Sequence, residues 1–297
     1  MSAPRTALTL LSVAAIAACG SPAVTTATVD MALPADPVTR LIGEIHLHQF
    51  PVGAHGWAAF LAASIPASAV DDDQLVGLTT RPTATEGTCT LFVPPTCAPD
   101  CGAQAYCAAP NLCKSLPVVQ YVDGGPITVT GSQLVPTIRM WFVNPDTGYN
   151  SDPAPGRQSL FAGGELLHVS GGTGGTAIEG TVLAPLPVEV SVPDPKQQLH
   201  FPTDSALQVR WKPAAAESMI LLLAASSPDG HYATIRCVTA DDGTLEVPAS
   251  LMKGLPPPPR SLRFELERDE QRFIKTVSPG VGVLTHAAFS AWQNGME

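Results

Sequence analysis

Positive charge is scarce in this chain of 297 residues. Lys and Arg number 16 against 26 Asp and Glu, and the formal net charge is −10. Proteins that bind nucleic acid or anionic lipid head groups contact phosphates with basic side chains. The shortage therefore argues against both kinds of partner, and we expect no nucleic acid ligand.

Long hydrophobic runs are also missing beyond residue 18. A helix that spans a bilayer needs about 20 apolar residues, and the most apolar later stretch, 219–225, is far shorter. The 30 prolines and 25 glycines argue against long helices and for many turns. Hydrophobic residues still make up 45% of the chain, which is ample material for a core.

The common local motifs of catalysis are absent as well. The sequence has no Gly-x-Ser-x-Gly and no His-Glu-x-x-His segment, and the glycine-rich stretch 171–175 lacks the Gly-Lys-Ser/Thr of a phosphate loop. Ser, His and Asp are scattered, and a triad is recognised only by its geometry. We therefore name no catalytic residue, expect no cofactor and favour a non-catalytic role.

The N-terminus has the features of an export signal. A short segment with one positive charge, Arg5, precedes the apolar run 6–18, which is too short to span a membrane but has the length of a signal-peptide core. The run ends in Ile16-Ala17-Ala18-Cys19, which resembles a bacterial lipobox. The alternative is an ordinary signal peptide followed by an incidental cysteine.

The lipobox resemblance implies that Cys19 is the lipidation site. In such proteins the thiol carries a diacylglycerol and the freed amine is acylated, often with palmitate. The resemblance therefore implies a membrane lipoprotein. Several acyl chains anchor stably where one binds only marginally. Gly20-Ser21 follows without the Asp that resembles an inner-membrane retention signal, so we expect a lipid anchor in the cell envelope at the outer membrane.

The cysteine count agrees with this interpretation. Setting Cys19 aside leaves six of the seven cysteines, an even number that suits disulfide bonds in an exported protein. The disulfide candidates are Cys89, Cys97, Cys101, Cys107, Cys113 and Cys237. Four of them can pair within 97–113, which makes Cys89 with Cys237 the simplest remaining pair, although Cys89 could also pair inside that segment.

Residues 97–113 form a compact cysteine-rich insert with the spacing C-x3-C-x5-C-x5-C. A segment this small cannot build a hydrophobic core, so crosslinks must hold it. Its part 101–107 resembles the small, loosely EGF-like inserts of secreted bacterial proteins. A zinc knuckle is the competing interpretation, but the spacing is not the usual C-x2–4-C pairing.

The remaining sequence predicts an all-β fold of two β-sandwich-like domains, because short β-branched or alternating stretches recur between turns. We expect a signal peptide at 1–18, a flexible tether at 19–38, an N-terminal β domain at 39–185 that carries the insert 97–113, and a second domain at 186–297. The last strands are predicted at 261–267, 272–277 and 281–287.

The second domain has about the strand number of an immunoglobulin or fibronectin-III sandwich. Its residues Val209-x-Trp211, Cys237, Asp242-Gly243 and Val247-Pro248-Ala249 resemble the C-terminal Ig-like domain of uncharacterised bacterial lipoproteins that carry a Cys-rich insert upstream. The resemblance implies architecture and no chemistry.

One group of residues has the chemistry of a metal site. His46 and His48 alternate on a predicted strand beside Glu44, and His55 follows after a turn. Three histidines can hold a catalytic zinc ion, which would make the protein a metal-dependent hydrolase. The alternative is a solvent-facing polar strand.

Aromatic side chains suggest a further possibility. If Trp57, Trp141 and Tyr149 are exposed, they could stack on sugars as part of a glycan-binding module. Taken together, the sequence favours a surface lipoprotein with a binding, adhesion or envelope-structural role. Its partners would be the membrane, through the N-terminal lipid, and an unknown protein or glycan ligand.

Overall fold

The computed structural model describes residues 38–50, 53–66, 82–99, 101, 105–115, 121–145, 147–152 and 159–297. For residues 53–66 and Tyr106 only the backbone is described. Residues 36–297 cluster as one compact unit. The predicted signal peptide, Cys19 and nearly all of the predicted tether lie outside the described residues.

The fold is mostly β, as the sequence predicts, with several antiparallel sheets and almost no helix. The largest sheet has eight strands, in the spatial order β2 (Gly53–Pro66), β1 (Arg40–Phe50), β18 (Val281–Met296), β17 (Ser261–Lys275), β14 (Ser218–Ser226), β15 (Tyr232–Thr239), β4 (Cys89–Phe92) and β3 (Pro82–Glu86). Its β1–β18 pair is parallel, and the other pairs in this sheet are antiparallel.

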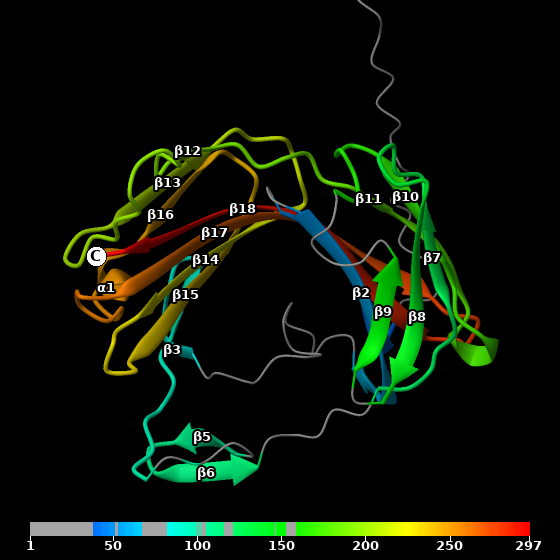
Figure 1. The fold of residues 1–297 in the computed structure, drawn as a ribbon, viewed down its shortest axis with the longest axis horizontal. Coiled ribbons are helices and arrows are strands. Elements are labelled where there is room, and N and C mark those ends of the chain that lie inside the picture. Colours follow the sequence, from blue (N-terminus) through cyan, green and yellow to red (C-terminus); the bar gives the residue numbers. More distant parts are fainter. Residues whose placement is uncertain are drawn as a thin grey trace, which may run out of the picture. The chain divides into compact units, whose positions relative to one another are not determined.

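Three smaller sheets complete the fold (Figure 1). The five-stranded sheet contains β11 (Ile178–Leu183), β10 (Leu166–Gly171), β7 (Ile127–Thr130), β8 (Thr137–Asn144) and β9 (Gly148–Asp152). The three-stranded sheet contains β12 (Val190–Val192), β13 (Leu207–Trp211) and β16 (Thr244–Val247), and β5 (Ala105–Ala109) pairs with β6 (Leu112–Ser115). One helical turn, α1 (Ala249–Met252), and a 3-10 turn at Gly174–Thr176 are the helical elements in the described part of the chain.

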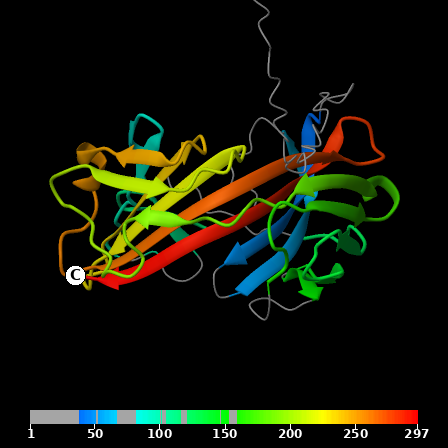
Figure 2. The ribbon, with the colours of Figure 1, turned by 90° about the horizontal axis from the view of Figure 1, so that it is seen from above.

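The long strands β17 and β18 form a hairpin (Figure 2). Side chains of this hairpin take part in two hydrophobic cores. Leu262 and Phe264 of β17 pack with residues of the three-stranded sheet, such as Val209. Ile274, near the other end of β17, packs with residues of the five-stranded sheet, such as Val169. Because side chains alternate along a strand, both cores lie against one face of the eight-stranded sheet.

The C-terminal strands differ from the prediction. The sequence predicts one strand that ends at Glu267 and another that begins at Arg272, which leaves residues 268–271 outside any strand. In the structure β17 continues through this run, paired to β18 from Ser261 opposite Met296 to Lys275 opposite Gly282. The prediction was wrong because these polar side chains are buried and find polar contacts inside the protein.

Strands from both sides of the expected junction at 184–187 share the large sheet. β1 pairs with β18, and β4 pairs with β15. The two regions are thus joined by main-chain hydrogen bonds in addition to the connecting chain.

Three disulfides join the cysteines of the described chain: Cys89–Cys237, Cys97–Cys107 and Cys101–Cys113. The first links neighbouring strands β4 and β15, in which Cys89 and Cys237 lie directly opposite each other. The other two tie β5–β6 and its flanking chain, so the expected cysteine-rich insert is held by crosslinks. No helix among the described residues is long and apolar enough to cross a bilayer.

Candidate functional site

The face of the eight-stranded sheet that points away from both cores carries an unusual density of ionisable side chains. It arises from period-two alternation in three adjacent strands, whose side chains point in turn to the cores and to this side. We call it the polar face and define it by Glu44, His46 and His48 of β1, Glu265, Glu267 and Asp269 of β17, and His286 and Ser290 of β18.

A cavity of about 200 Å³ lies on the polar face. Six of its lining residues are histidine, aspartate or glutamate from the centre of the sheet, and Arg236 of β15 adds a positive charge. Ile220 and Leu222 of β14 form an apolar wall. A small cavity with apolar walls and a few convergent polar groups is the usual form of a ligand site.

Glu44, His46 and His286 form the first group of side chains, which we call the inner group. His46 Nε2 lies 2.6 Å from Glu44 Oε2. The rings of His46 and His286 stack with centroids 4.2 Å apart and planes inclined by 17°. One donor atom from each of the three residues lies within 4.8 Å of the other two. Glu44 and His286 are buried and His46 is partly buried.

Burial changes the proton affinity of the inner group. It raises the pKa of Glu44 to about 7, because the charged carboxylate loses its hydration, while the nearby His286 acts in the opposite direction.

Asp269 lies next to the inner group. Its Oδ2 is 3.4 Å from His286 Nδ1 and accepts a hydrogen bond of 2.7 Å from Gln271 Nε2. Its Oδ1 is buried and has no hydrogen-bond partner among the described residues. Buried polar atoms are nearly always partnered, so an exception calls for an explanation.

His48, Glu265 and Glu267 form the second group, the outer group. His48 Nε2 lies 2.8 Å from Glu267 Oε2 and 2.6 Å from Ser290 Oγ. Ser290 Oγ donates to Glu267 Oε2 at 3.0 Å, and Arg263 Nη2 donates to Glu265 Oε2 at 2.5 Å. The carboxylates of this group thus have donors within the protein.

Ser290, His48 and Glu267 have the residue types of a hydrolytic triad but not its geometry. In a triad the serine and the carboxylate contact different ring nitrogens of the histidine, so that the carboxylate orients the ring while the other nitrogen accepts the serine proton. Here both contacts fall on Nε2. Glu267 also accepts the Ser290 hydrogen directly, and Ser290 is fully buried.

The structure distributes the predicted metal ligands over two groups. His46 belongs to the inner group and His48 to the outer one. His55 lies opposite His48 in the β1–β2 register, but its side chain is outside the described residues, so a site of three histidines and the hydrolase it implies stay predictions. The sequence analysis missed His286, Glu265, Glu267 and Asp269. The alternation Glu265-x-Glu267-x-Asp269 could have indicated three carboxylates on one face of a strand, whereas no local pattern marks His286.

The aromatic residues considered for glycan binding lie in different settings. Tyr149 is buried; its hydroxyl donates to the carbonyl of Gly125 at 2.9 Å and accepts from Gly124 N–H at 2.7 Å. It therefore belongs to the core and offers no sugar platform. Trp141 is 43% exposed, and the Trp57 side chain lies outside the described residues.

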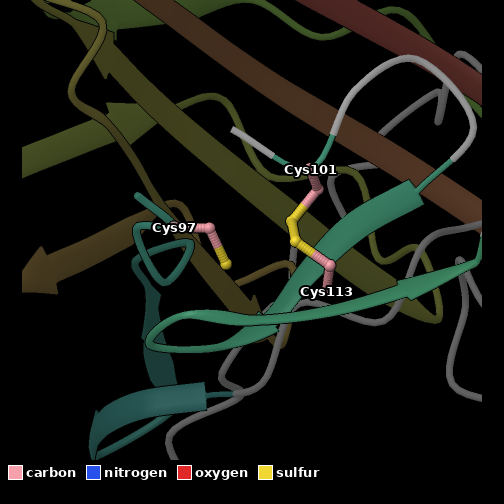
Figure 3. A group of neighbouring side chains, drawn as sticks. All are labelled: Cys97, Cys101 and Cys113. Carbon is pink, nitrogen blue, oxygen red and sulfur yellow. A yellow bond between two sulfur atoms is a disulfide. The ribbon is translucent and has the colours of Figure 1, made fainter. Parts of the chain in front are cut away.

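The cysteine-rich insert brings sulfur atoms together, as Figure 3 shows for Cys97, Cys101 and Cys113. Their Sγ atoms lie within 4.8 Å of one another. Cys101 is bonded to Cys113, however, and Cys97 to Cys107. A cysteine binds a metal ion through its thiolate, and the sulfur atoms of these disulfides are not thiolates.

Comparison with known proteins adds no assignment: no protein-family model matches the chain, and neither a curated protein nor a solved structure shows significant similarity to it.

Proposed function

We propose that the protein is a lipid-anchored binding protein of the cell envelope, exported and held at the outer membrane through Cys19. The observation that carries this proposal is the pairing of the cysteines. The three disulfides use all six cysteines other than Cys19, which leaves Cys19 without a cysteine partner in its own chain. Disulfides persist in oxidising compartments, in keeping with export by the N-terminal signal.

The cavity on the polar face is the proposed binding site. It combines a volume of about 200 Å³ with buried and partly buried histidines and carboxylates from three adjacent strands. Groups held on paired strands are placed more rigidly than groups on loops. This arrangement supports recognition of a small polar or charged ligand, whereas the geometry around Ser290 offers no nucleophile for hydrolysis.

The finer architecture belongs to the same proposal. The three-stranded sheet and part of the eight-stranded sheet enclose a shared core that includes Trp211, Leu221 and Ile235. Two sheets packed face to face around a core make a β-sandwich. We assign the region 186–297 to an Ig-like or fibronectin-III-like sandwich, and the region 39–185 to a second sandwich-like unit.

Intact mass of the membrane-extracted protein tests the anchor. We expect the mass of residues 19–297 plus acyl groups, and six alkylatable thiols that appear only after reduction. The Cys19→Ser variant should leave the membrane fraction, while the neighbouring Ser21→Ala variant should stay with it. An unacylated mass, or a Cys19→Ser protein still bound to membranes, would rule out lipidation at Cys19.

A further inference from the structure

We propose that the inner group, Glu44, His46 and His286, binds one divalent transition-metal ion, with Asp269 orienting His286. This inference deepens the proposed binding function by naming the ligand class, and it rests on that proposal for the choice of the cavity as the site.

The donor atoms of the inner group suit a transition-metal ion. Two imidazoles and one carboxylate, each with a donor atom within 4.8 Å of the other two, are a common ligand set for zinc and for other first-row metals. Tetrahedral zinc with bonds of 2.0–2.1 Å needs donors about 3.4 Å apart. The paired strands hold the Cα positions of His46 and His286 opposite each other, and binding one ion requires the two imidazole rings to rotate out of their stack.

The negative charge of the polar face also favours a bound cation. The polar face carries the carboxylates of Glu44, Glu265, Glu267 and Asp269, and the guanidinium groups near them are those of Arg236 and Arg263. With the histidines neutral, and with Glu44 left out of the count because burial raises its pKa to about 7, one negative charge is in excess. Buried charge is costly unless it is paired or coordinates a metal, and a divalent cation would neutralise this excess.

Asp269 is placed to orient His286. It is almost fully buried and lines the cavity, and its Oδ1 lacks a hydrogen-bond partner among the described residues. Its other oxygen lies 3.4 Å from His286 Nδ1. Histidines that bind metals commonly present their second ring nitrogen to a carboxylate, which fixes the ring and increases its basicity. Asp269 occupies this position, so it is a positioning residue here.

The outer group is less suited to an ion, because its charges have partners inside the protein. Glu265 pairs with Arg263, and Glu267 accepts from Ser290 and contacts His48. The nitrogen and oxygen donors of the inner group also favour zinc and similar ions over magnesium and calcium, which prefer oxygen ligands alone.

The test is metal binding by the full-length protein in detergent, stripped with a chelator and titrated with Zn²⁺ alone or Mg²⁺ alone. We expect one equivalent of Zn²⁺ by calorimetry and by elemental analysis of the dialysed protein, and no tight Mg²⁺ binding. Glu44→Gln and His46→Asn should each abolish stoichiometric zinc binding. Asp269→Asn should weaken it by about 10–100-fold.

His168→Asn is the matched control. His168 also lies on a strand beside a glutamate, with its Nε2 3.6 Å from Glu179 Oε1, but the pair is exposed on the five-stranded sheet. This variant should bind zinc like the wild type. Zinc binding that survives Glu44→Gln and His46→Asn, or that disappears only with His48→Gln, would overturn the assignment to the inner group, as would a folded wild type that binds no zinc.

A spectroscopic measurement on the wild type avoids dependence on the folding of variants. Co²⁺ in place of Zn²⁺ should give visible d–d bands without thiolate charge-transfer bands, because the inner group contains no sulfur. Thiolate bands would move the site to the cysteine-rich insert and overturn the proposal. Titration of the Cys19→Ser chain separates the two proposals: zinc binding there with loss of membrane attachment supports both, whereas attachment through Cys19 without zinc binding refutes only the metal site.

Discussion

Arg268 and Asp241 form an ion pair in the interior of the protein. Arg268 Nε donates to Asp241 Oδ2 at 3.0 Å and Nη2 donates to Oδ1 at 3.3 Å, and each side chain is 1% exposed. The remaining guanidinium hydrogens bind the carbonyl oxygens of Leu186, Pro187 and Lys212. One side chain of β17 thus fixes the segment that joins the five-stranded sheet to the three-stranded sheet.

Replacement of Arg268 by Met should destabilise the protein by about 3–5 kcal/mol, because it leaves a buried carboxylate without its counter-charge. The measurement is urea unfolding followed by tryptophan fluorescence. Lys212→Met is the matched control: its ion pair with Glu189 is exposed, at 70% and 65%, and should contribute less than about 1 kcal/mol. Equal effects of the two substitutions would contradict the role given to Arg268.

The same pair predicts a pH dependence. Burial by itself raises the pKa of Asp241, but hydrogen bonds from Ala216 N–H, Arg268, the Trp211 indole and Ala214 N–H outweigh it and hold the pKa below the ordinary value of 3.8. A lowered folded-state pKa stabilises the protein above the unfolded value, and this stabilisation is lost as pH falls through the folded value.

Urea unfolding of wild type and Asp241→Asn at several pH values tests this linkage. The wild type should be the more stable protein at pH 7, and its advantage should shrink as the pH falls below about 3.8. Other carboxylates, such as Glu165, titrate in both proteins, so the difference between them isolates Asp241. An advantage that stays constant down to acid pH would contradict the prediction.

The disulfides should differ in their contribution to stability. Cys89–Cys237 closes a loop with a sequence separation of 148, against 10 and 12 for the two bonds of the insert. Loop entropy predicts a loss of about 4–5 kcal/mol for the double variant Cys89→Ser/Cys237→Ser. Cys101→Ser/Cys113→Ser should leave the main unfolding transition in place, because β5 and β6 pair with each other in a sheet of their own.

Urea unfolding without reductant measures both double variants against the wild type. A loss of stability in the main transition as large for the insert variant as for the Cys89/Cys237 variant would show that the insert is part of the cooperative core.

Local patterns predicted much of the fold. Leu207-x-Val209-x-Trp211 alternates, and all three side chains enter the core from β13 as expected. The cysteine density of 97–113 indicated an insert held by crosslinks, and the structure contains two disulfides there. These features depend on residues close in sequence, so one sequence is enough to recognise them.

Long-range pairing was beyond the sequence. His46 and His286 are 240 positions apart and become neighbours only because β1 and β18 pair in parallel, with these two residues opposite each other. No periodicity in either strand specifies its partner. The inner group was therefore visible only in part, as Glu44-x-His46. The residues that bind Arg268, such as Asp241 and Leu186, are likewise distant from it in sequence.

The arrangement of His48, Ser290 and Glu267 leads to a prediction about reactivity. Ser290 Oγ donates to Glu267 Oε2, and His48 Nε2 contacts both residues, so the serine proton is directed to the carboxylate and the histidine is not placed between the two as in a triad. A fluorophosphonate probe, which labels activated serines, should therefore leave the wild type unlabelled, as it should the Ser290→Ala control. Intact mass after incubation measures this. An adduct on the wild type that is absent from Ser290→Ala would establish Ser290 as an activated nucleophile and would favour a hydrolase over a binding protein. Without an adduct, the proposal that the ionisable groups of the polar face bind a ligand is retained.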